Sequence, residues 1–586
     1  MKKQIALICS ISIISLFTYA QSLDLKWSKT MMYDNKLDGF FNEFIDANSK
    51  YVYAKYNNLA IKPKKANRKI KFIAYDKNTM EKVAEARVKG YGDGKTEQQK
   101  FDGLNYYKTL VFENVIYSFW IREEKQKEEL FVETYDAGLK LIAPLKKIYE
   151  ISSNTSKRSK YGRSILVLSN KKFGEKVVIG GELPAEKEQN VKFEYKLLNS
   201  DLTFANANQV ELPIKLLGKN YGLTSNYTFG DDGNLYISSF VSMSKEERKL
   251  AKKGESMSYS IFSAIDIANG KLVPFTFKFD NKNIFNLGYT VTKSGVKVYG
   301  FFCDLNKDPQ GNDMHGIFYS ILDSKQMTMT ATNFTYFDKA TLDKLFAKDK
   351  EDQKTGKKKT RNQQAKVSDD ESLDGRFEIE NVQTDGDDII LFTSKMTNWS
   401  TTTCDSKGNC TTRYYCTKDN ITTFKVNKNG DLVWASNLDR EMTYSGWNIY
   451  DVRIMKQNNN FYAVYGSRFG LDADVKNRKS KKSKSDLRDR VEYAIFNNND
   501  GSYKKEEIII NADKTPKKER KAVNPLNITV INDVFYVNSQ RVRLKPGLTT
   551  LYCLASLPCP LFLVALSADG NVRKGTGNLG VIKPIK

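Results

Sequence analysis

The cysteines of this chain are the residues whose type and spacing most directly suggest chemistry. Residues 404–416 read CDSKGNCTTRYYC, and their C-x5-C spacing occurs again at residues 553–559. Cysteines this close together can bind zinc, exchange with other thiols or form disulfides. The cysteines beyond the first twenty residues are Cys303, Cys404, Cys410, Cys416, Cys553 and Cys559. The compartment in which the protein folds decides between these chemistries.

The N-terminal residues predict that compartment. Two lysines precede an almost wholly apolar run from Ile5 to Phe17, and a Thr-Tyr-Ala cleavage pattern follows it. The run is too short for a spanning helix. We expect residues 1–20 to be a cleaved signal peptide, with an uncleaved anchor as the alternative. Residues 21–586 would then be exported to the periplasm, the outer-membrane surface or the medium. The apolar run at residues 551–566 is short and interrupted by prolines, so no transmembrane segment is expected after cleavage.

Export favours disulfides, because oxidising compartments preserve them and the number of remaining cysteines is even. Zinc would normally require a fourth Cys or His nearby, and the only histidine is distant in sequence. The spacing and the remaining cysteines predict three pairs: Cys404–Cys410, Cys553–Cys559 and Cys303–Cys416. Six cysteines allow many other pairings, so this connectivity is a preference among alternatives.

Other catalytic or metal-binding residues are sparse. His315 is the sole histidine, which makes a catalytic triad or a His-rich metal site difficult to build and favours an ordinary loop residue. Asp304, Asn306 and Asp308 alternate oxygen ligands as calcium loops do. However, Pro309 stands where such a loop needs glycine, and His315 where it needs glutamate. These three residues are a weak calcium candidate, and no other cofactor is predicted.

Positive charge is concentrated in four segments. The whole chain carries +24, of which Lys62–Lys71, Lys348–Lys366, Lys476–Arg490 and Lys514–Lys521 contribute +6, +5, +6 and +4. Blocks of like charge tend to be exposed and available to oppositely charged partners. We expect an anionic envelope component (lipid phosphate or polysaccharide) or an acidic protein, and no nucleic acid. Loops that only confer solubility are the alternative. The candidate contact residues are Lys62, Lys64, Lys65, Arg68, Lys357, Lys358, Lys359, Arg361, Lys479, Lys481, Lys482, Lys484, Lys517 and Lys518.

Eight units of similar pattern follow one another along the chain. Each has a strand, a tight polar turn, a second strand, a variable connector, a third strand, an Asx or Gly turn and a fourth strand. The second strands are expected to be YVYAKY from Tyr51, VIYSFW from Val115, SILVLS from Ser164, NLYISSF from Asn234, VKVYGFF from Val296, DIILFTS from Asp388, NFYAVYG from Asn460 and VFYVNS from Val534. A unit of this kind must stack on neighbours to bury its faces. The pattern predicts an all-β protein, a β-propeller of four-stranded blades. Eight blades are expected and seven are the alternative, with a pair of β-sandwiches as the competing architecture.

The turns between third and fourth strands contain the residues that short hairpins need. Asn-Gly and Asp-Gly supply the positive φ of such turns. These turns are expected at residues 76–78, 136–138, 199–201, 269–270, 323–325, 429–430, 500–501 and 569–570. In the sixth unit, NKNGDLVWASNLDR resembles one repeat of the PQQ-like propellers through Gly430 and Trp434. The other units lack this tryptophan, so the resemblance implies a propeller architecture and no quinone cofactor.

The long connectors are expected to share one face. Because neighbouring strands of a blade are antiparallel, second-to-third connectors and connectors between blades leave from the same side. We call this side the elaborated face and the opposite side, with its short turns, the plain face. Binding sites gather on loops held by a rigid scaffold, so the elaborated face is the functional candidate. Short helices are expected from Ser244 and from Asp338. The long insertions are residues 330–375, 395–416, 471–490 and 512–524.

The cysteine-rich segment is expected to form a hairpin arm on this face. The expected register, centred on Lys407, pairs Cys404 with Cys410, Trp399 with Tyr415 and Ile390 with Phe424. Each strand would then have about 16 residues and a length of roughly 50 Å, far longer than usual. A disulfide near its tip would staple the arm.

These features favour an exported, non-enzymatic binding or scaffold propeller that contacts an anionic partner through its basic loops. The alternative is a glycan-cleaving enzyme that uses carboxylates or tyrosine at the central channel. The sequence identifies no catalytic residue for that alternative.

Overall fold

A computed structural model gives the arrangement of most of the chain. It describes residues 22–585 except 35–39, 58–69, 88–103, 125–126, 153–164, 172–173, 184–188, 216–224, 243–248, 250–257, 293–294, 309–310, 312, 324, 346–371, 375–376, 405–409, 446–451, 466–489, 512–513, 517–518, 520, 522, 524–527 and 545–571. The expected signal peptide lies outside the described residues. Within these ranges no helix is long and apolar enough to cross a membrane.

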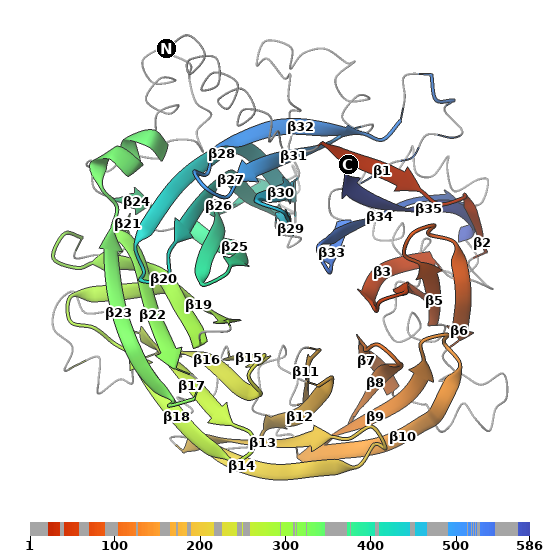
Figure 1. Ribbon diagram of the computed structural model, residues 1–586, viewed down its shortest axis with the longest axis horizontal. Coiled ribbons are helices and arrows are strands. Elements are labelled where there is room, and N and C mark those ends of the chain that lie inside the picture. The colour runs from red at the N-terminus through yellow and green to blue at the C-terminus, as the bar shows by residue number, and fades with distance from the viewer. Residues whose placement is uncertain are drawn as a thin grey trace, which may run out of the picture.

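The strands form eight four-stranded antiparallel blades in a ring, so the protein is an eight-bladed β-propeller, as predicted (Figure 1). Blade 1 comprises β3 (Phe40–Ala47), β4 (Tyr51–Asn57), β5 (Lys71–Asp76) and β6 (Lys82–Arg87). Blade 2 comprises β7 (Leu104–Val111), β8 (Val115–Glu123), β9 (Lys127–Asp136) and β10 (Leu141–Ser152). Blade 3 comprises β11 (Ile165–Asn170), β12 (Lys176–Glu182), β13 (Asn190–Leu198) and β14 (Phe204–Lys215). Blade 4 comprises β15 (Ser225–Phe229), β16 (Asn234–Ser242), β17 (Ser258–Asp266) and β18 (Lys271–Phe277).

The second half of the ring repeats this order. Blade 5 comprises β19 (Lys282–Thr292), β20 (Gly295–Asp304), β22 (Gly316–Asp323) and β23 (Thr328–Tyr336). Blade 6 comprises β25 (Phe377–Asp385), β26 (Asp388–Cys404), β27 (Cys410–Val426) and β28 (Leu432–Ser445). Blade 7 comprises β29 (Arg453–Gln457), β30 (Asn460–Val464), β31 (Arg490–Asn497) and β32 (Tyr503–Ile509). Blade 8 comprises β33 (Ile528–Ile531), β34 (Val534–Leu544), β35 (Val572–Pro584) and β1 (Leu23–Trp27), with β2 (Met31–Asp34) also paired to β35. A small separate sheet joins β21 (Asp313–Met314) to β24 (Leu373–Asp374).

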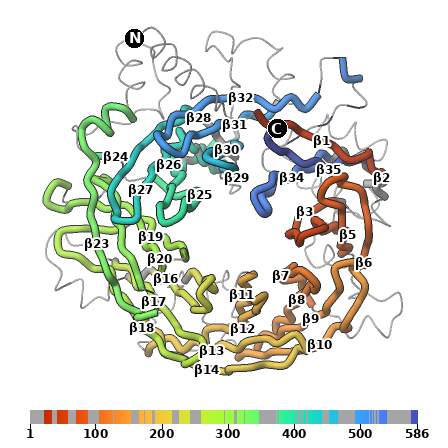
Figure 2. The backbone as a smooth tube through the Cα atoms, viewed as in Figure 1, coloured from red at the N-terminus to blue at the C-terminus, as the bar shows by residue number. Residues whose placement is uncertain are grey.

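The ring is closed by both ends of the chain. β1 pairs antiparallel with the end of β35, from Leu23 opposite Pro584 to Trp27 opposite Gly580. The Tyr493 hydroxyl of blade 7 accepts a 2.9 Å hydrogen bond from the Leu23 N–H. Figure 2 shows the red N-terminal strand beside the dark blue C-terminal one. The N-terminal strand therefore supplies the fourth strand of blade 8.

This closure corrects one sequence assignment, and blade 3 corrects another. β35 pairs with both β34 and β1, so it is the third strand of blade 8 and not the fourth. The turn expected before it, at residues 569–570, lies outside the described residues. In blade 3, SILVLS forms β11, which is the first strand, and β12 is the second. Both strands are short apolar runs, so their order could not be read from composition.

The other seven third-to-fourth turns occur where they were expected. Gly430 and Gly501 have φ values of 91° and 69°, which glycine adopts without steric cost. The turn after β22 is held by Asp323, whose carboxylate accepts hydrogen bonds from the backbone N–H groups of Lys325 at 2.8 Å and Gln326 at 2.9 Å. These bonds lower the pKa of Asp323 below its ordinary value.

The core lies between neighbouring blades, where the faces of adjacent sheets pack together. Phe392 of blade 6, for example, has its ring centroid 6.1 Å from that of Phe461 and 5.7 Å from that of Phe496 in blade 7. Trp434, the residue behind the PQQ-like resemblance, packs on Gly501 of the same neighbour. A Cβ at Gly501 would lie 2.4 Å from its ring. Each large side chain buried in this way contributes about 1.5–3 kcal/mol, so the blades stabilise one another.

The predicted helix after blade 5 is present at residues 339–345. The Asp338 carboxylate caps it by accepting a 2.6 Å hydrogen bond from the Thr341 N–H, as expected for a helix start. Leu342 and Leu345 are buried against blades 5 and 6. The helix predicted from Ser244 falls almost wholly outside the described residues.

Candidate binding face

The basic residues predicted to contact a partner, from Lys62 to Lys518, all lie outside the described residues. The strands that flank them are described. Two of the four segments connect a second strand to a third strand, in blades 1 and 7, and two connect blade 5 to 6 and blade 7 to 8. Second and fourth strands of a blade run in the same direction, so all four segments leave and return on the elaborated face.

The plain face has the opposite charge tendency in its described residues. Its turns, with the residue on either side, contain sixteen acidic residues against nine lysines. The acidic residues are Asp76, Glu81, Glu113, Asp136, Glu175, Asp201, Asp231, Asp232, Asp266, Asp323, Asp385, Asp387, Asp388, Asp431, Asp500 and Asp533. The lysines are Lys50, Lys77, Lys82, Lys140, Lys171, Lys176, Lys271, Lys325 and Lys428. Acidic residues therefore predominate in the described turns of the plain face, while the strands that flank the four basic segments end on the opposite face.

Several plain-face carboxylates join neighbouring turns. Glu113 of blade 2 accepts a 3.0 Å hydrogen bond from the Ser49 N–H of blade 1, and its own N–H donates at 2.7 Å to Glu175 of blade 3. Lys171 of blade 3 reaches past blade 2 to an ion pair of 2.6 Å with Asp46 of blade 1. These contacts use plain-face charges to hold the ring together, which leaves the elaborated face as the candidate for binding.

The elaborated face has a small hollow of about 30 Å³ where blade 4 meets blade 5. Aromatic rings form part of its wall, and amides and an exposed ammonium group stand among them. A hollow of this volume holds about two water molecules and does not enclose a ring compound. The amide and ammonium groups around it can donate hydrogen bonds to a ligand that lies on the surface. The lining residues that matter are Tyr259, Phe277, Lys278, Phe279, Asn281 and Asn283.

Lys282, at the edge of this hollow, is held by its surroundings. Its Nζ donates a 2.7 Å hydrogen bond to the Tyr336 hydroxyl and lies 3.5 Å from Asp304 Oδ2. It also lies 5.0 to 5.3 Å from the ring centroids of Tyr336, Phe302 and Phe334. The Tyr336 hydroxyl in turn donates to Asp304. Because Asp304 balances its charge, Lys282 positions Tyr336, which is 40% exposed.

The weak calcium candidate adjoins this cluster, and its carboxylates accept protein hydrogen bonds. Asp304 Oδ1 accepts from the Asn306 N–H at 3.0 Å. Asp308 Oδ2 accepts from the Asp313 N–H at 3.0 Å. Among the described residues, no group of three or more His, Cys, Asp or Glu side chains is arranged to hold a metal ion. Calcium binding here stays a prediction.

His315 is buried rather than being an ordinary loop residue. It is 4% exposed, and its Nδ1 accepts a 3.2 Å hydrogen bond from the Asp304 N–H. Burial lowers the pKa of His315 below its ordinary value of 6.5. The side chain is therefore neutral in the folded protein at neutral pH, and it fixes the start of the Asp304 loop.

This environment predicts a pH dependence. Because the folded state disfavours the charged imidazole, the contribution of His315 to stability is complete above pH 6.5 and falls as the pH drops below that value. A His315→Gln variant, which keeps an acceptor for the Asp304 N–H, should lose less stability than wild type between pH 6.5 and pH 5. Urea unfolding at several pH values measures this difference. Parallel stability curves for the two proteins would contradict it.

A buried ion network, which sequence reasoning missed, lies at the base of the hairpin arm. Glu380, Lys418 and Arg440 come from three strands of blade 6, and each side chain is 1% exposed. Arg440 Nη2 donates to Glu380 Oε1 at 2.7 Å, and Lys418 Nζ lies 3.6 Å from the same oxygen. The other oxygen accepts from the Val452 N–H of blade 7 at 2.7 Å. No clear signal for this network stood in the sequence, because all three residues stand among other charged or polar residues: Glu378 near Glu380, Asp419 after Lys418, and Asp439 and Glu441 beside Arg440.

Polar side chains on the innermost strands bridge adjacent blades. Tyr107 and Lys108 of β7 donate to the carbonyls of Ile165 at 3.1 Å and Val167 at 3.2 Å in β11. Lys456 of β29 donates to the Thr384 carbonyl in β25 at 3.0 Å. These side chains hydrogen-bond to backbone carbonyls of the neighbouring blade, so they help to pack the blades together. They do not converge on a common point as catalytic side chains do.

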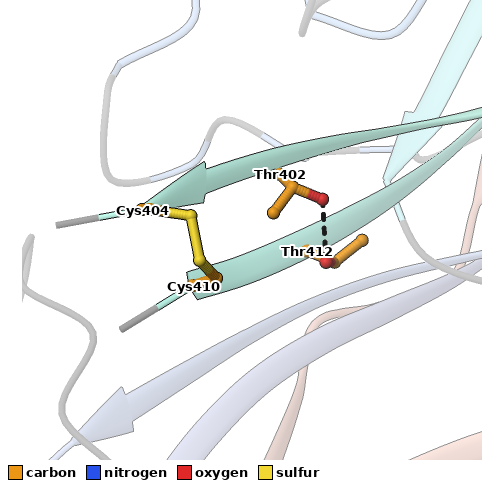
Figure 3. Close-up of a disulfide and its surroundings, with 4 residues drawn as sticks. All are labelled: Thr402, Cys404, Cys410 and Thr412. Carbon is orange, nitrogen blue, oxygen red and sulfur yellow. Dashed lines mark hydrogen bonds between the residues drawn. A yellow bond between two sulfur atoms is a disulfide. The ribbon is translucent and has the colours of Figure 1, made fainter. Parts of the chain in front are cut away.

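The hairpin arm is present with its predicted disulfide. Cys404 and Cys410 are bonded, and they face each other at the ends of two 17-residue strands (Figure 3). Trp399 pairs with Tyr415 as predicted. Ile390 pairs with Lys425 and not with Phe424, because a bulge between Ser394 and Met396 shifts the register by one residue. The predicted insertion at 395–416 is therefore a regular extension of β26 and β27.

The remaining cysteines give one correction. Cys303 and Cys416 are free and buried, so the expected pair does not form. Cys303 Sγ lies 3.7 Å from the Asp308 carbonyl in its own loop, and burial raises its pKa to about 12. Each thiol lies within its own blade. Cys553 and Cys559 lie outside the described residues.

Comparison with known proteins leaves the family open. No family model and no curated protein matches the sequence. The polysaccharide lyase Uly1 is similar in structure, with 10% identity over 96% of this chain and 100% of its own, and a TM-score of 0.32. A PL25 ulvan lyase bound to -[GlcA(1-4)Rha3S]- has 10% identity over 82% of this chain and 96% of its own, with a TM-score of 0.31. BamB from Moraxella catarrhalis has 11% identity over 75% of this chain and 96% of its own, with a TM-score of 0.31. These similarities are too low to indicate a function.

Proposed function

We propose that this protein is an exported, non-enzymatic binding propeller of the cell envelope whose elaborated face holds an anionic partner. The supporting observation is that four segments with most of the net positive charge are anchored on one face, while acidic residues outnumber lysines on the other. A charge separation of this kind orients an approaching anion. The plain-face acids repel the same partner, so binding is one-sided.

Among anionic partners we favour an acidic polysaccharide, because Lys278, Asn281 and Asn283 around the hollow between blades 4 and 5 offer donors to sugar hydroxyls and acidic groups. Phe277 is buried in this wall and Phe279 is half-buried, while the exposed Lys278 can donate to a carboxylate or sulfate. The glycan-cleaving alternative gains no support from the inner strands, where Tyr107 and Lys108 bridge blades.

The main test replaces Lys479, Lys481, Lys482 and Lys484 by serine. Affinity for an acidic polysaccharide should fall about tenfold or more at low salt, because a face with fewer lysines releases fewer counterions from the partner on binding. For the same reason, the slope of log affinity against log salt should become shallower by about one for each lysine that no longer neutralises an anionic group. Titration calorimetry at two salt concentrations measures both quantities, and anionic lipid vesicles are titrated in parallel.

A matched control removes the same charge from the plain face. The exposed lysines Lys50, Lys140, Lys325 and Lys428 are replaced by serine, and affinity should stay close to that of wild type. A Lys278→Ser variant should weaken binding of polysaccharide more than binding of vesicles. Equal losses in the two quadruple variants would show that only overall charge matters. Absence of binding to both ligands would reject the proposed function.

A further inference from the structure

The hairpin arm has two strand edges that no described strand occupies. The shorter one is Cys410–Tyr414 of β27, beyond its last pair with β28 at Tyr415, and it carries the charged residue Arg413. The longer one belongs to β26. β25 pairs with β26 only as far as Lys395, opposite Phe377, whereas β26 continues for nine residues, Met396–Cys404. Its other side pairs with β27 up to Cys410. The described side chains near the tip, from Ser400 to Cys404, are exposed. The outer edge of this segment therefore presents a row of backbone donors and acceptors.

This edge also lacks the usual protection against pairing. Exposed edges normally carry charges, prolines or bulges that prevent another strand from adding to them. The outer strands of blades 2, 3 and 4 contain Pro144, Pro213 and Pro274, and those of blades 1, 6 and 7 contain charged residues. β23 is uncharged, but a register shift interrupts its pairing. The segment Met396–Cys404 reads MTNWSTTTC, with no charge or proline and with its bulge before it.

The pairing of β26 with β27 inside the arm indicates which kind of strand can pair with the outer edge of β26. Within the arm, the Thr402 and Thr412 hydroxyls are 3.0 Å apart (Figure 3), and Thr403 pairs with Thr411. A threonine-rich strand is thus matched by another threonine-rich strand through cross-strand hydroxyl contacts. Two identical edges that pair antiparallel are related by a two-fold axis, so the backbone donors and acceptors of each edge meet those of the other. A second copy of the segment Met396–Cys404 meets this requirement.

The length of the arm makes such a contact compatible with the charge of the protein. A chain of net charge +24 repels a copy of itself. In an antiparallel pair of the nine-residue segments, however, Cys404 of one chain lies beside Met396 of the other, which places the bases of the two arms about 30 Å apart. That distance exceeds the Debye length of about 8 Å at physiological ionic strength, so the repulsion is largely screened.

We propose that two copies of this protein associate through the outer edges of β26, with Met396–Cys404 of one chain paired antiparallel to the same segment of the other. The mode is strand addition, in which backbone hydrogen bonds supply the affinity. The association is independent of the anion-binding role, and its salt dependence has the opposite sign. Added salt screens repulsion between the two bodies and strengthens the dimer, whereas it weakens binding of a polyanion.

Sedimentation equilibrium of the mature protein, at low and at high salt, tests the proposal. Wild type should form dimers whose dissociation constant decreases as salt is added. A Ser400→Lys/Thr402→Lys variant places like charges across the two-fold axis and should raise the dissociation constant about tenfold or more. The control is Thr412→Lys, which adds a charge to the same side of the arm but on β27. It should leave the dimer intact.

Two results would overturn the proposal. The first is a wild type that stays monomeric at high salt and at its highest soluble concentration. The second is equal weakening by Thr412→Lys, because the association would then involve the surface of the arm and not the β26 edge. Circular dichroism and melting temperatures of all variants should match wild type, since the substituted positions are exposed.

Discussion

Glu380→Gln should destabilise the protein by about 3–5 kcal/mol, the cost of leaving buried charges without their partner. Glu380 neutralises Arg440 and Lys418, and all three side chains are 1% exposed. Burial alone would raise the pKa of Glu380, but the attraction of Arg440 and Lys418 outweighs it and lowers the pKa below its ordinary value. Glutamine preserves the shape and removes the charge, so two cations would remain in an interior that solvates them poorly.

Equilibrium unfolding in urea measures this loss, with Glu81→Gln as the matched control. Glu81 also forms an ion pair, with Lys29 at 3.0 Å, but the side chains are 56% and 90% exposed. Such surface pairs contribute about 0–1 kcal/mol, so the control should remain near wild type. If Glu380→Gln lowers the free energy of unfolding no more than this control does, then Glu380 is not needed to neutralise Arg440 and Lys418.

Glu133→Gln should have the opposite effect and stabilise the protein at alkaline pH. Glu133 is 3% exposed and accepts a 3.2 Å hydrogen bond from Trp120 Nε1. Burial raises its pKa to about 7 from an ordinary value of 4.5. The folded state thus favours the protonated acid, and wild type should lose stability as the pH rises from about 4.5 through 7. With about 1.4 kcal/mol for each pKa unit, the loss amounts to about 3 kcal/mol at pH 8.

Glutamine cannot ionise, so the variant should not show this loss. The difference in unfolding free energy between Glu133→Gln and wild type should grow by about 2–3 kcal/mol from pH 5 to pH 8. Because His315 is present in both proteins, its titration cancels in this difference. Glu81→Gln serves again as the control, and its curve should run parallel to that of wild type. A pH-independent difference for Glu133→Gln would show that Glu133 is ionised in the folded protein without penalty.

The strand-and-turn pattern of the sequence was enough to predict the architecture. Turn chemistry is local, and seven of the eight third-to-fourth turns occur where expected. Three of them contain an Asn-Gly or Asp-Gly pair with its glycine at positive φ, whereas in the other four the positive φ is at a non-glycine residue: Met80, Leu139, Leu202 or Met327. The register at the arm tip was predictable for the same reason, because Cys404 and Cys410 lie only six residues apart. The placement of the basic segments on one face followed from strand direction, which alternates in an antiparallel blade.

Contacts between distant residues were decided by the tertiary structure. The fourth strand of blade 8 comes from the N-terminus. This could not be predicted, because any strand of suitable pattern can close the ring and local sequence does not identify it. The one-residue shift between Ile390 and its partner depends on a bulge that no local signal marks. Glu380 meets Arg440 across 60 residues because blade 6 folds four strands side by side. Cys303 and Cys416 stay apart because each is buried where its own blade places it. The sequence by itself determined the repeating units and the side of the ring on which the strands flanking the basic segments end, because those depend on neighbouring residues and strand direction. Only the tertiary structure decided which charges are buried together, because residues such as Glu380 and Arg440 meet only when the strands of a blade lie side by side.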